Sequence, residues 1–176
     1  MKSIFKSLTL IVIIVSSLSS CTEPNLKDQV IGKWDYQIYI DAQKAKTIFG
    51  SEDGVEMEMT ADLSVNYMRG NRYNSEGDVG VRVKANGQEI PMKFRVTETG
   101  SWEIHDNYII SIVEGSKFTP ADEGTRKLVK NTPGLAESLA PVKGESVSTE
   151  IKEISDKSMQ VEIDNLPGLI ITHHKK

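Results

Sequence analysis

The chain has very little cysteine and no excess of positive charge. Cys21 is the one cysteine among 176 residues, so no disulfide framework can form within the chain. Lys and Arg number 21 against 25 Asp and Glu, which gives a formal charge of -4 at pH 7. Because phosphate binding requires a concentrated basic face, this balance excludes nucleic acid as an expected partner.

The chain also lacks a hydrophobic run long enough to cross a bilayer, which takes about 20 apolar residues. Its hydrophobic content of 38% and charged content of 26% indicate one globular domain. The most apolar stretch, Leu8 to Val15, follows the basic residues Lys2 and Lys6 and precedes small residues at 16–20. This order predicts a secretory signal peptide over residues 1–20.

The signal peptide ends in Leu18-Ser19-Ser20-Cys21, which resembles a lipobox, the cleavage signal of bacterial lipoproteins. The resemblance implies that the Cys21 thiol receives a diacylglycerol, that cleavage occurs before Cys21, and that the new amino terminus is acylated. The alternative is an ordinary signal peptide with a cysteine near the cut. Thr22 stands where an aspartate would retain a lipoprotein in the inner membrane, which implies the outer membrane of a Gram-negative bacterium.

The acyl chains would have to hold the protein at the membrane by themselves. Each buried methylene contributes about 0.8 kcal/mol, so one chain binds marginally and two or three bind firmly. The acidic excess offers no attraction to an anionic lipid surface. Residues 21–28 are polar and contain Pro24, so we expect a lipidated tether there and a single domain over residues 29–176.

Beyond the tether, apolar and polar residues alternate with the period of a β-strand. Asn86-Gly87 lies between two alternating runs and predicts a hairpin turn, because both residues tolerate positive φ. The pattern predicts an all-β domain, a sandwich or an antiparallel barrel, with no βαβ unit. The ten alternating runs lie at residues 34–40, 55–59, 63–67, 79–83, 90–96, 102–104, 108–112, 147–154, 159–163 and 169–172.

Two stretches interrupt the alternation. The first, Asp41 to Asp53, contains a candidate short helix at Ala42 to Phe49. The second is an insertion near residues 115–145, rich in Gly, Pro and charge, with candidate helices around Arg126–Lys130 and Leu135–Leu139. A long connection in a compact domain is usually functional or disordered, so this insertion is a candidate lid.

Ile31-Gly32-Lys33-Trp34 opens the first predicted strand and resembles the Gly-x-Trp signature of lipocalins and the wider calycin group. Gly100-Ser101-Trp102-Glu103-Ile104, followed by Asn107-Tyr108, is similar to a hairpin of bacterial lipocalin-like lipoproteins. The resemblance implies an antiparallel up-and-down barrel of about eight to ten strands. It also implies that Trp34 packs across the closed end, plugged by Leu26 to Val30.

Two family features are missing from the chain. The Thr-Asp-Tyr motif of lipocalins is absent, and no arginine follows Arg126 to stack on the tryptophan. The resemblance is therefore described as lipocalin-like.

A barrel of this size holds one small ligand or is filled by its own side chains. The candidate interior residues combine adaptable methionines with large aromatic rings, which suits an apolar ligand and equally an ordinary core. The strand pattern places few polar groups inward. The candidates for the interior are Trp34, Tyr36, Met57, Met59, Tyr67, Met92, Phe94 and Trp102.

Little in the sequence indicates catalysis. His173 and His174 are adjacent on a predicted strand and should point to opposite faces, which does not suit one metal ion. No Gly-x-Ser-x-Gly elbow is present, and Glu56 and Glu58 lie on a predicted wet face. We therefore expect no enzyme activity, no metal and no cofactor.

Two functions remain open. The first is a lipid-anchored cell-envelope protein that binds a small apolar molecule in the barrel. The alternative is a non-catalytic interaction module with a filled barrel, which contacts another envelope protein or a glycan. A continuous internal cavity of at least ~300 Å³ would favour the first.

Overall fold

The computed structural model describes residues 25–50 and 54–176. The predicted signal peptide and Cys21 lie outside the described residues. Leu26 to Asp28, expected in the tether, are the first residues of a short helix, α1 (Leu26–Val30). Within the described part of the chain, no helix is both long enough and apolar enough to cross a membrane.

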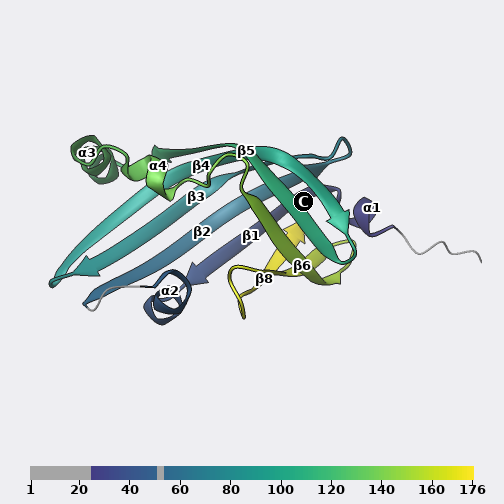
Figure 1. Ribbon diagram of the computed structural model, residues 1–176, viewed down its shortest axis with the longest axis horizontal. Helices are drawn as coiled ribbons and strands as arrows, with labels where there is room; N and C mark the ends of the chain where they lie inside the picture. Colours follow the sequence, from purple (N-terminus) through teal and green to yellow (C-terminus); the bar gives the residue numbers. More distant parts are fainter. Residues whose placement is uncertain (1–24, 51–53) are drawn as a thin grey trace, which may run out of the picture.

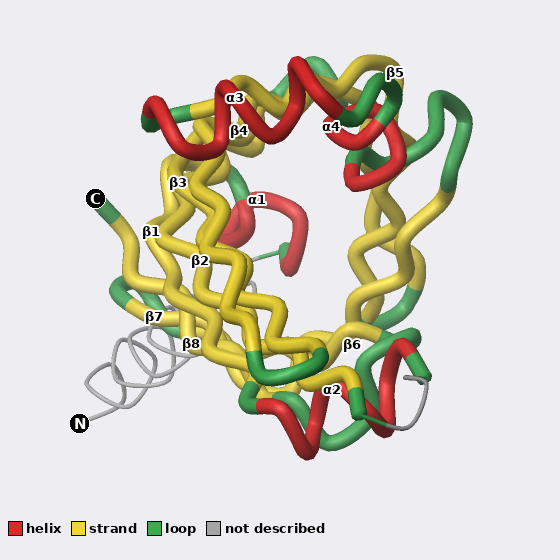
Figure 2. Tube along the Cα trace, turned by 90° about the vertical axis from the view of Figure 1, so that its left-hand side faces the viewer, coloured by secondary structure: helices red, strands yellow, loops and turns green. Residues whose placement is uncertain are grey.

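Most of the domain is one antiparallel sheet of eight strands that closes into a barrel (Figures 1 and 2). Each strand pairs with the next in the sequence, and β8 returns to pair with β1, as expected for up-and-down order. The strands are β1 (Gly32–Ile40), β2 (Val55–Met68), β3 (Arg72–Ala85), β4 (Gln88–His105), β5 (Tyr108–Pro120), β6 (Ser146–Ile154), β7 (Ser158–Ile163) and β8 (Ile170–Lys175).

The ten alternating runs of the sequence form eight strands because two pairs of runs are continuous. Residues 55–59 and 63–67 belong to β2, and residues 90–96 and 102–104 belong to β4. Between the two runs of β2, the inward position carries the small residue Ala61. Between the two runs of β4, the inward positions carry Glu98 and Gly100. These three residues interrupt the apolar pattern of the sequence. The predicted hairpin turn is confirmed: Asn86 and Gly87 have φ of 51° and 75°.

The strands differ greatly in length, and this difference shapes the two ends of the barrel. β6 to β8 are short, and β5 pairs with β6 over Tyr108–Ile112. β1 pairs with β8 over three positions, Trp34 to Tyr36. β2 to β5 continue well beyond the region in which all eight strands are paired, as Figure 1 shows. One end of the barrel is therefore ringed by all eight strands, and the other is a mouth bordered by the projecting strands.

Helix α1 plugs the ringed end. The indole Nε1 of Trp34 donates to the carbonyl oxygen of Val30 at 2.7 Å, and both residues are fully buried. The Lys175 ammonium lies 4.8 Å from the centre of the Trp34 ring and donates to the carbonyl oxygen of Gln29 at 3.0 Å. In Figure 2, α1 lies within the outline of the ring. Lys175 thus places a cation over the Trp34 ring, in a chain that has no arginine after Arg126.

The other helices lie towards the mouth. α2 (Ala42–Phe49) has the predicted bounds and begins where the Asp41 carboxylate accepts from Lys44 N at 2.8 Å. The insertion is shorter than predicted, since Gly115 to Pro120 complete β5. It contains α3 (Glu123–Asn131), which begins earlier than expected, and α4 (Leu135–Leu139), as predicted.

Candidate functional site

The barrel interior contains a cavity of about 330 Å³. All eight strands contribute to its lining, and Leu139 and Pro141 of the insertion complete it near the mouth. The insertion therefore borders the cavity as the lid hypothesis requires. The lining residues are Tyr36, Ile38, Met59, Ala61, Leu63, Val65, Tyr67, Tyr73, Ser75, Val79, Val81, Val96, Glu98, Ile109, Ser111, Phe118, Leu139, Pro141, Val147, Thr149, Met159, Val161, Ile163, Ile171 and His173.

Three of the eight candidate interior residues, Tyr36, Met59 and Tyr67, line this cavity. The other five lie in the core around it. Trp34 and Trp102 are buried in the cluster at the plugged end, whereas Met92 and Phe94 belong to a second cluster that packs against α3 and α4. Half-buried Met57 packs against both clusters.

Polar side chains gather on one side of the cavity, so the prediction of few inward polar groups is wrong. The Tyr73 hydroxyl donates to Oε1 of Glu98 at 2.7 Å. Ser75 lies opposite Glu98 in the β3–β4 register, and the rings of Tyr67 and Tyr73 lie 6.3 Å apart. Tyr36 of β1 and Ser111 of β5 also line the cavity, so each of the strands β1 to β5 supplies a polar group to this wall.

A glycine makes the contact between Tyr73 and Glu98 possible. Gly100 lies opposite Tyr73 in the register of β3 and β4. A Cβ atom on Gly100 would lie 2.5 Å from Cε1 of Tyr73 and 2.1 Å from the carbonyl oxygen of Ile112. Both distances are shorter than van der Waals contact, so only glycine lets the tyrosine ring cover β4 and reach Glu98.

Burial in the barrel interior changes the pKa values of the side chains in this polar wall. Burial raises the pKa of Glu98; the hydrogen bond from Tyr73 opposes this change, and the negative charge of Glu145 adds to it. Burial also raises the pKa of Tyr36 to about 12 and that of Tyr67 further, so both phenols are neutral at pH 7. Among the described residues that line the cavity there is no lysine or arginine.

His173 is buried in the same cavity, with 5% of its surface exposed. Its ring lies 4.2 Å from the ring of Tyr36, and its Nδ1 atom has no hydrogen-bond partner. Burial lowers the pKa of His173 to about 4, so the ring is neutral at pH 7. His174 is exposed on the outside, which confirms that the two histidines point to opposite faces.

Tyr36 and Tyr67 were identified from the sequence as interior residues, whereas the other polar residues of the cavity were not, although a signal was present. Glu98 is in phase with inward Val96, and His173 is in phase with inward Ile171. Extending the alternation of β3 backwards from Val79 also reaches Tyr73 and Ser75. Strand phase would therefore have found them, whereas a search for apolar residues passed over them.

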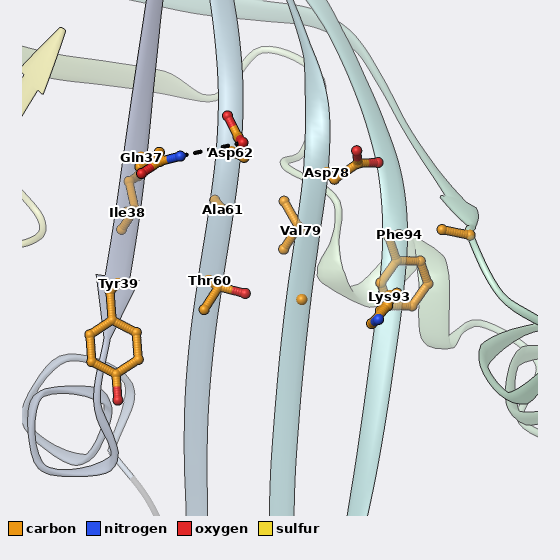
Figure 3. A pocket seen from close by; sticks show the side chains of 12 residues that line it. Gln37, Ile38, Tyr39, Thr60, Ala61, Asp62, Asp78, Val79, Lys93 and Phe94 are labelled. Carbon is orange, nitrogen blue, oxygen red and sulfur yellow. Dashed lines mark hydrogen bonds between the residues drawn. The ribbon is translucent and has the colours of Figure 1, made fainter.

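A second hollow lies on the outer face of β1 to β4, with a volume of about 700 Å³ (Figure 3). Its polar side chains are exposed, and Gln37 Nε2 donates to Asp62 Oδ2 at the long distance of 3.4 Å. Tyr39 at its edge is 59% exposed. It lacks the buried, convergent polar groups of the interior cavity, which is therefore the candidate site.

Within residues 25–50 and 54–176, no group of three or more His, Cys, Asp and Glu side chains is placed to hold a metal ion. No protein-family model matches the chain, and no curated protein is significantly similar to it in sequence.

Proposed function

We propose that this chain is a lipid-anchored, lipocalin-like protein of the bacterial cell envelope that binds a small apolar molecule in its barrel. The observation that carries the proposal is the unfilled interior of about 330 Å³. Ligand pockets occupy roughly 300–1,000 Å³. At about 30 Å³ for each water-sized group, the cavity suits a ligand of on the order of ten non-hydrogen atoms.

The lipocalin-like assignment is supported by more than the barrel. Gly32-Lys33-Trp34 opens β1, and the tryptophan is buried at the end that α1 plugs. Lys175 lies over the Trp34 ring and takes the place of the arginine that the family resemblance led us to expect. A cation on a tryptophan face is stabilising whether it is lysine or arginine, so the packing scheme is preserved.

The proposed anchor would attach at the plugged end. Cys21 precedes Asn25, the cap of α1, by four residues, which can span at most about 14 Å when fully extended. A lipid on Cys21 would therefore hold α1 near the outer-membrane surface and leave the mouth facing away from it. Under this proposal, the ligand enters from the aqueous side and not directly from the bilayer.

Binding is favoured over the two other functions. An interaction module with a filled barrel would not leave an internal space of this size. Catalysis would require a nucleophile beside a base, but the Nδ1 atom of His173 has no hydrogen-bond partner and its ring is stacked on Tyr36. We therefore propose a binding protein without enzyme activity or cofactor.

The test is to purify the protein from the membranes of the cells that produce it and to examine it by native mass spectrometry and solvent extraction. A bound molecule of the expected size supports the proposal. Val147→Trp should displace that molecule, because Val147 lines the cavity. Ile170→Trp, at a residue that is 48% exposed, is the matched control and should retain it. A protein that never carries or takes up a small molecule would contradict the proposal.

A further inference from the structure

The polar wall of the cavity indicates which chemical class of ligand it binds, an inference that rests on the proposed function. We propose that the ligand is an amphiphilic amine, with its ammonium group beside Glu98 and its apolar part against the rest of the cavity. The carboxyl group and the tyrosines of the site favour a cation over an anion or a neutral group, and the remaining features favour a hydrogen-bond donor with an apolar body.

Glu98 is the one carboxyl group among the cavity-lining residues that the structure describes. Lys175, which lies over Trp34 at the plugged end and donates to the backbone of α1, is not among the residues that line the cavity. The carboxylate of a fatty acid would therefore meet a like charge and no partner, which is costly in an interior of low polarity. An ammonium group would instead supply the opposite charge that the buried carboxylate lacks.

The hydrogen bond from Tyr73 fixes Glu98 in a binding orientation. The Tyr73 hydroxyl occupies Oε1 at 2.7 Å. No described side chain donates to Oε2, and Glu98 is half-buried on the cavity wall. Oε2 is therefore left to accept from a ligand, and a charge-assisted bond from an ammonium is the strongest interaction available to it.

Three tyrosine rings line the same cavity as the Glu98 carboxyl group. Tyr36, Tyr67 and Tyr73 come from three neighbouring strands, and the negative charge of Glu98 acts on all three. The faces of neutral aromatic rings attract cations, and desolvation strengthens this attraction. A carboxylate bordered by tyrosines therefore suits an ammonium group better than it suits a hydroxyl.

His173 provides a second and independent indication that a hydrogen-bond donor belongs in the cavity. Its Nδ1 atom is buried without a partner, and its ring stacks on Tyr36, next to the tyrosine cluster. A buried polar atom of this kind is normally satisfied by a bound group. A neutral ring protonated on Nε2 would present Nδ1 as an acceptor, which a ligand N–H can fill.

The opposite wall accommodates the apolar part of the ligand. β6 to β8 contribute Val147, Met159, Val161, Ile163 and Ile171, and Leu139 lies near the mouth. These side chains offer no charge and can adapt to a hydrocarbon tail. The ligand that matches both walls has one protonated nitrogen and a compact apolar body.

The experiment compares octylamine, 1-octanol and octanoate, which differ in head group and share one tail length. Binding is measured at pH 7.5 by isothermal titration calorimetry on the full domain, using the wild type, Glu98→Gln and the control Glu103→Gln. Glu103 is exposed and lies on the same strand. Circular dichroism and retention of 1-octanol binding establish that Glu98→Gln is folded.

We expect octylamine to bind wild type and Glu103→Gln about tenfold to a hundredfold more tightly than 1-octanol, with octanoate weakest. Glu98→Gln should lose that advantage and bind the amine and the alcohol alike. Equal binding of amine and alcohol by the wild type, tightest binding of octanoate, or an unchanged amine affinity in Glu98→Gln would overturn the amine proposal and leave the binding function intact. Failure of all three probes to bind would overturn both.

Discussion

Replacing His173 by phenylalanine should make the barrel less sensitive to acid. The ring of His173 is 5% exposed and stacks on Tyr36 at 4.2 Å, and burial lowers its pKa to about 4. An unfolded histidine has a pKa of about 6.5. Phenylalanine keeps an aromatic ring against Tyr36 but has no proton to bind.

The direction of the pH effect follows from these two pKa values. As the pH falls from about 6.5 to about 4, the unfolded chain binds a proton at His173 that the folded chain excludes. Proton uptake then favours unfolding, so His173 costs no stability above about pH 6.5 and costs progressively more below it. The difference between the two pKa values corresponds to about 3 kcal/mol, or about 6–12 °C in Tm for a domain of this size.

The assay is thermal unfolding by circular dichroism between pH 4.5 and pH 7.5. The wild type, His173→Phe and the control His174→Phe are compared, since His174 is the adjacent residue and is exposed. Glu98 and the other carboxyl groups are present in all three proteins, so their contributions cancel. The Tm of His173→Phe should fall less at acid pH than the Tm of the other two. Parallel pH profiles for the wild type and His173→Phe would refute the burial of this ring in the barrel interior.

Three further outcomes test other parts of the molecule. Trp34→Ala should lower the free energy of unfolding by about 3–5 kcal/mol in urea titrations, because the indole is fully buried under α1; an unchanged Tm would contradict the plugged end. Gly100→Ala should cost about 1–3 kcal/mol or prevent folding, since its Cβ would lie 2.1 Å from a backbone oxygen; wild-type stability in the same titration would show that β4 and β5 can separate freely. Cys21→Ser should move the protein from the membrane fraction to the soluble fraction; persistent membrane attachment would argue against lipidation.

Local features of the chain were predictable because neighbouring residues determine them. Asp41 caps α2, and the helix occupies the predicted residues. Asn86 and Gly87 form the predicted turn because both accept positive φ. The alternation of apolar residues also indicated an antiparallel all-β domain, since it reports which face of each strand is buried.

Long-range packing determined what this local pattern could not. Gly100 is part of β4, and the Tyr73 ring from β3 fills the space that a side chain at this position would occupy. Glu98 has the phase of the inward residues of β4, and its partner Tyr73 comes from the neighbouring strand β3. The packing of Tyr73 over Gly100 and the hydrogen bond from Tyr73 to Glu98 are not visible in one strand by itself, because each depends on a residue of the neighbouring strand.

The sequence by itself determined the alternation within the strands, the Asn86-Gly87 turn and helix α2, all of which depend on residues close together in the chain. The lipobox-like segment stays a prediction from the sequence. Only the tertiary structure decided that the interior remains open and that Glu98, the tyrosines and His173 face the same space. Those residues come from β1 to β4 and β8, and closure of the sheet brings β8 back to β1. Which side chains share a barrel interior depends on strand lengths, register and closure together, and these are properties of the whole sheet.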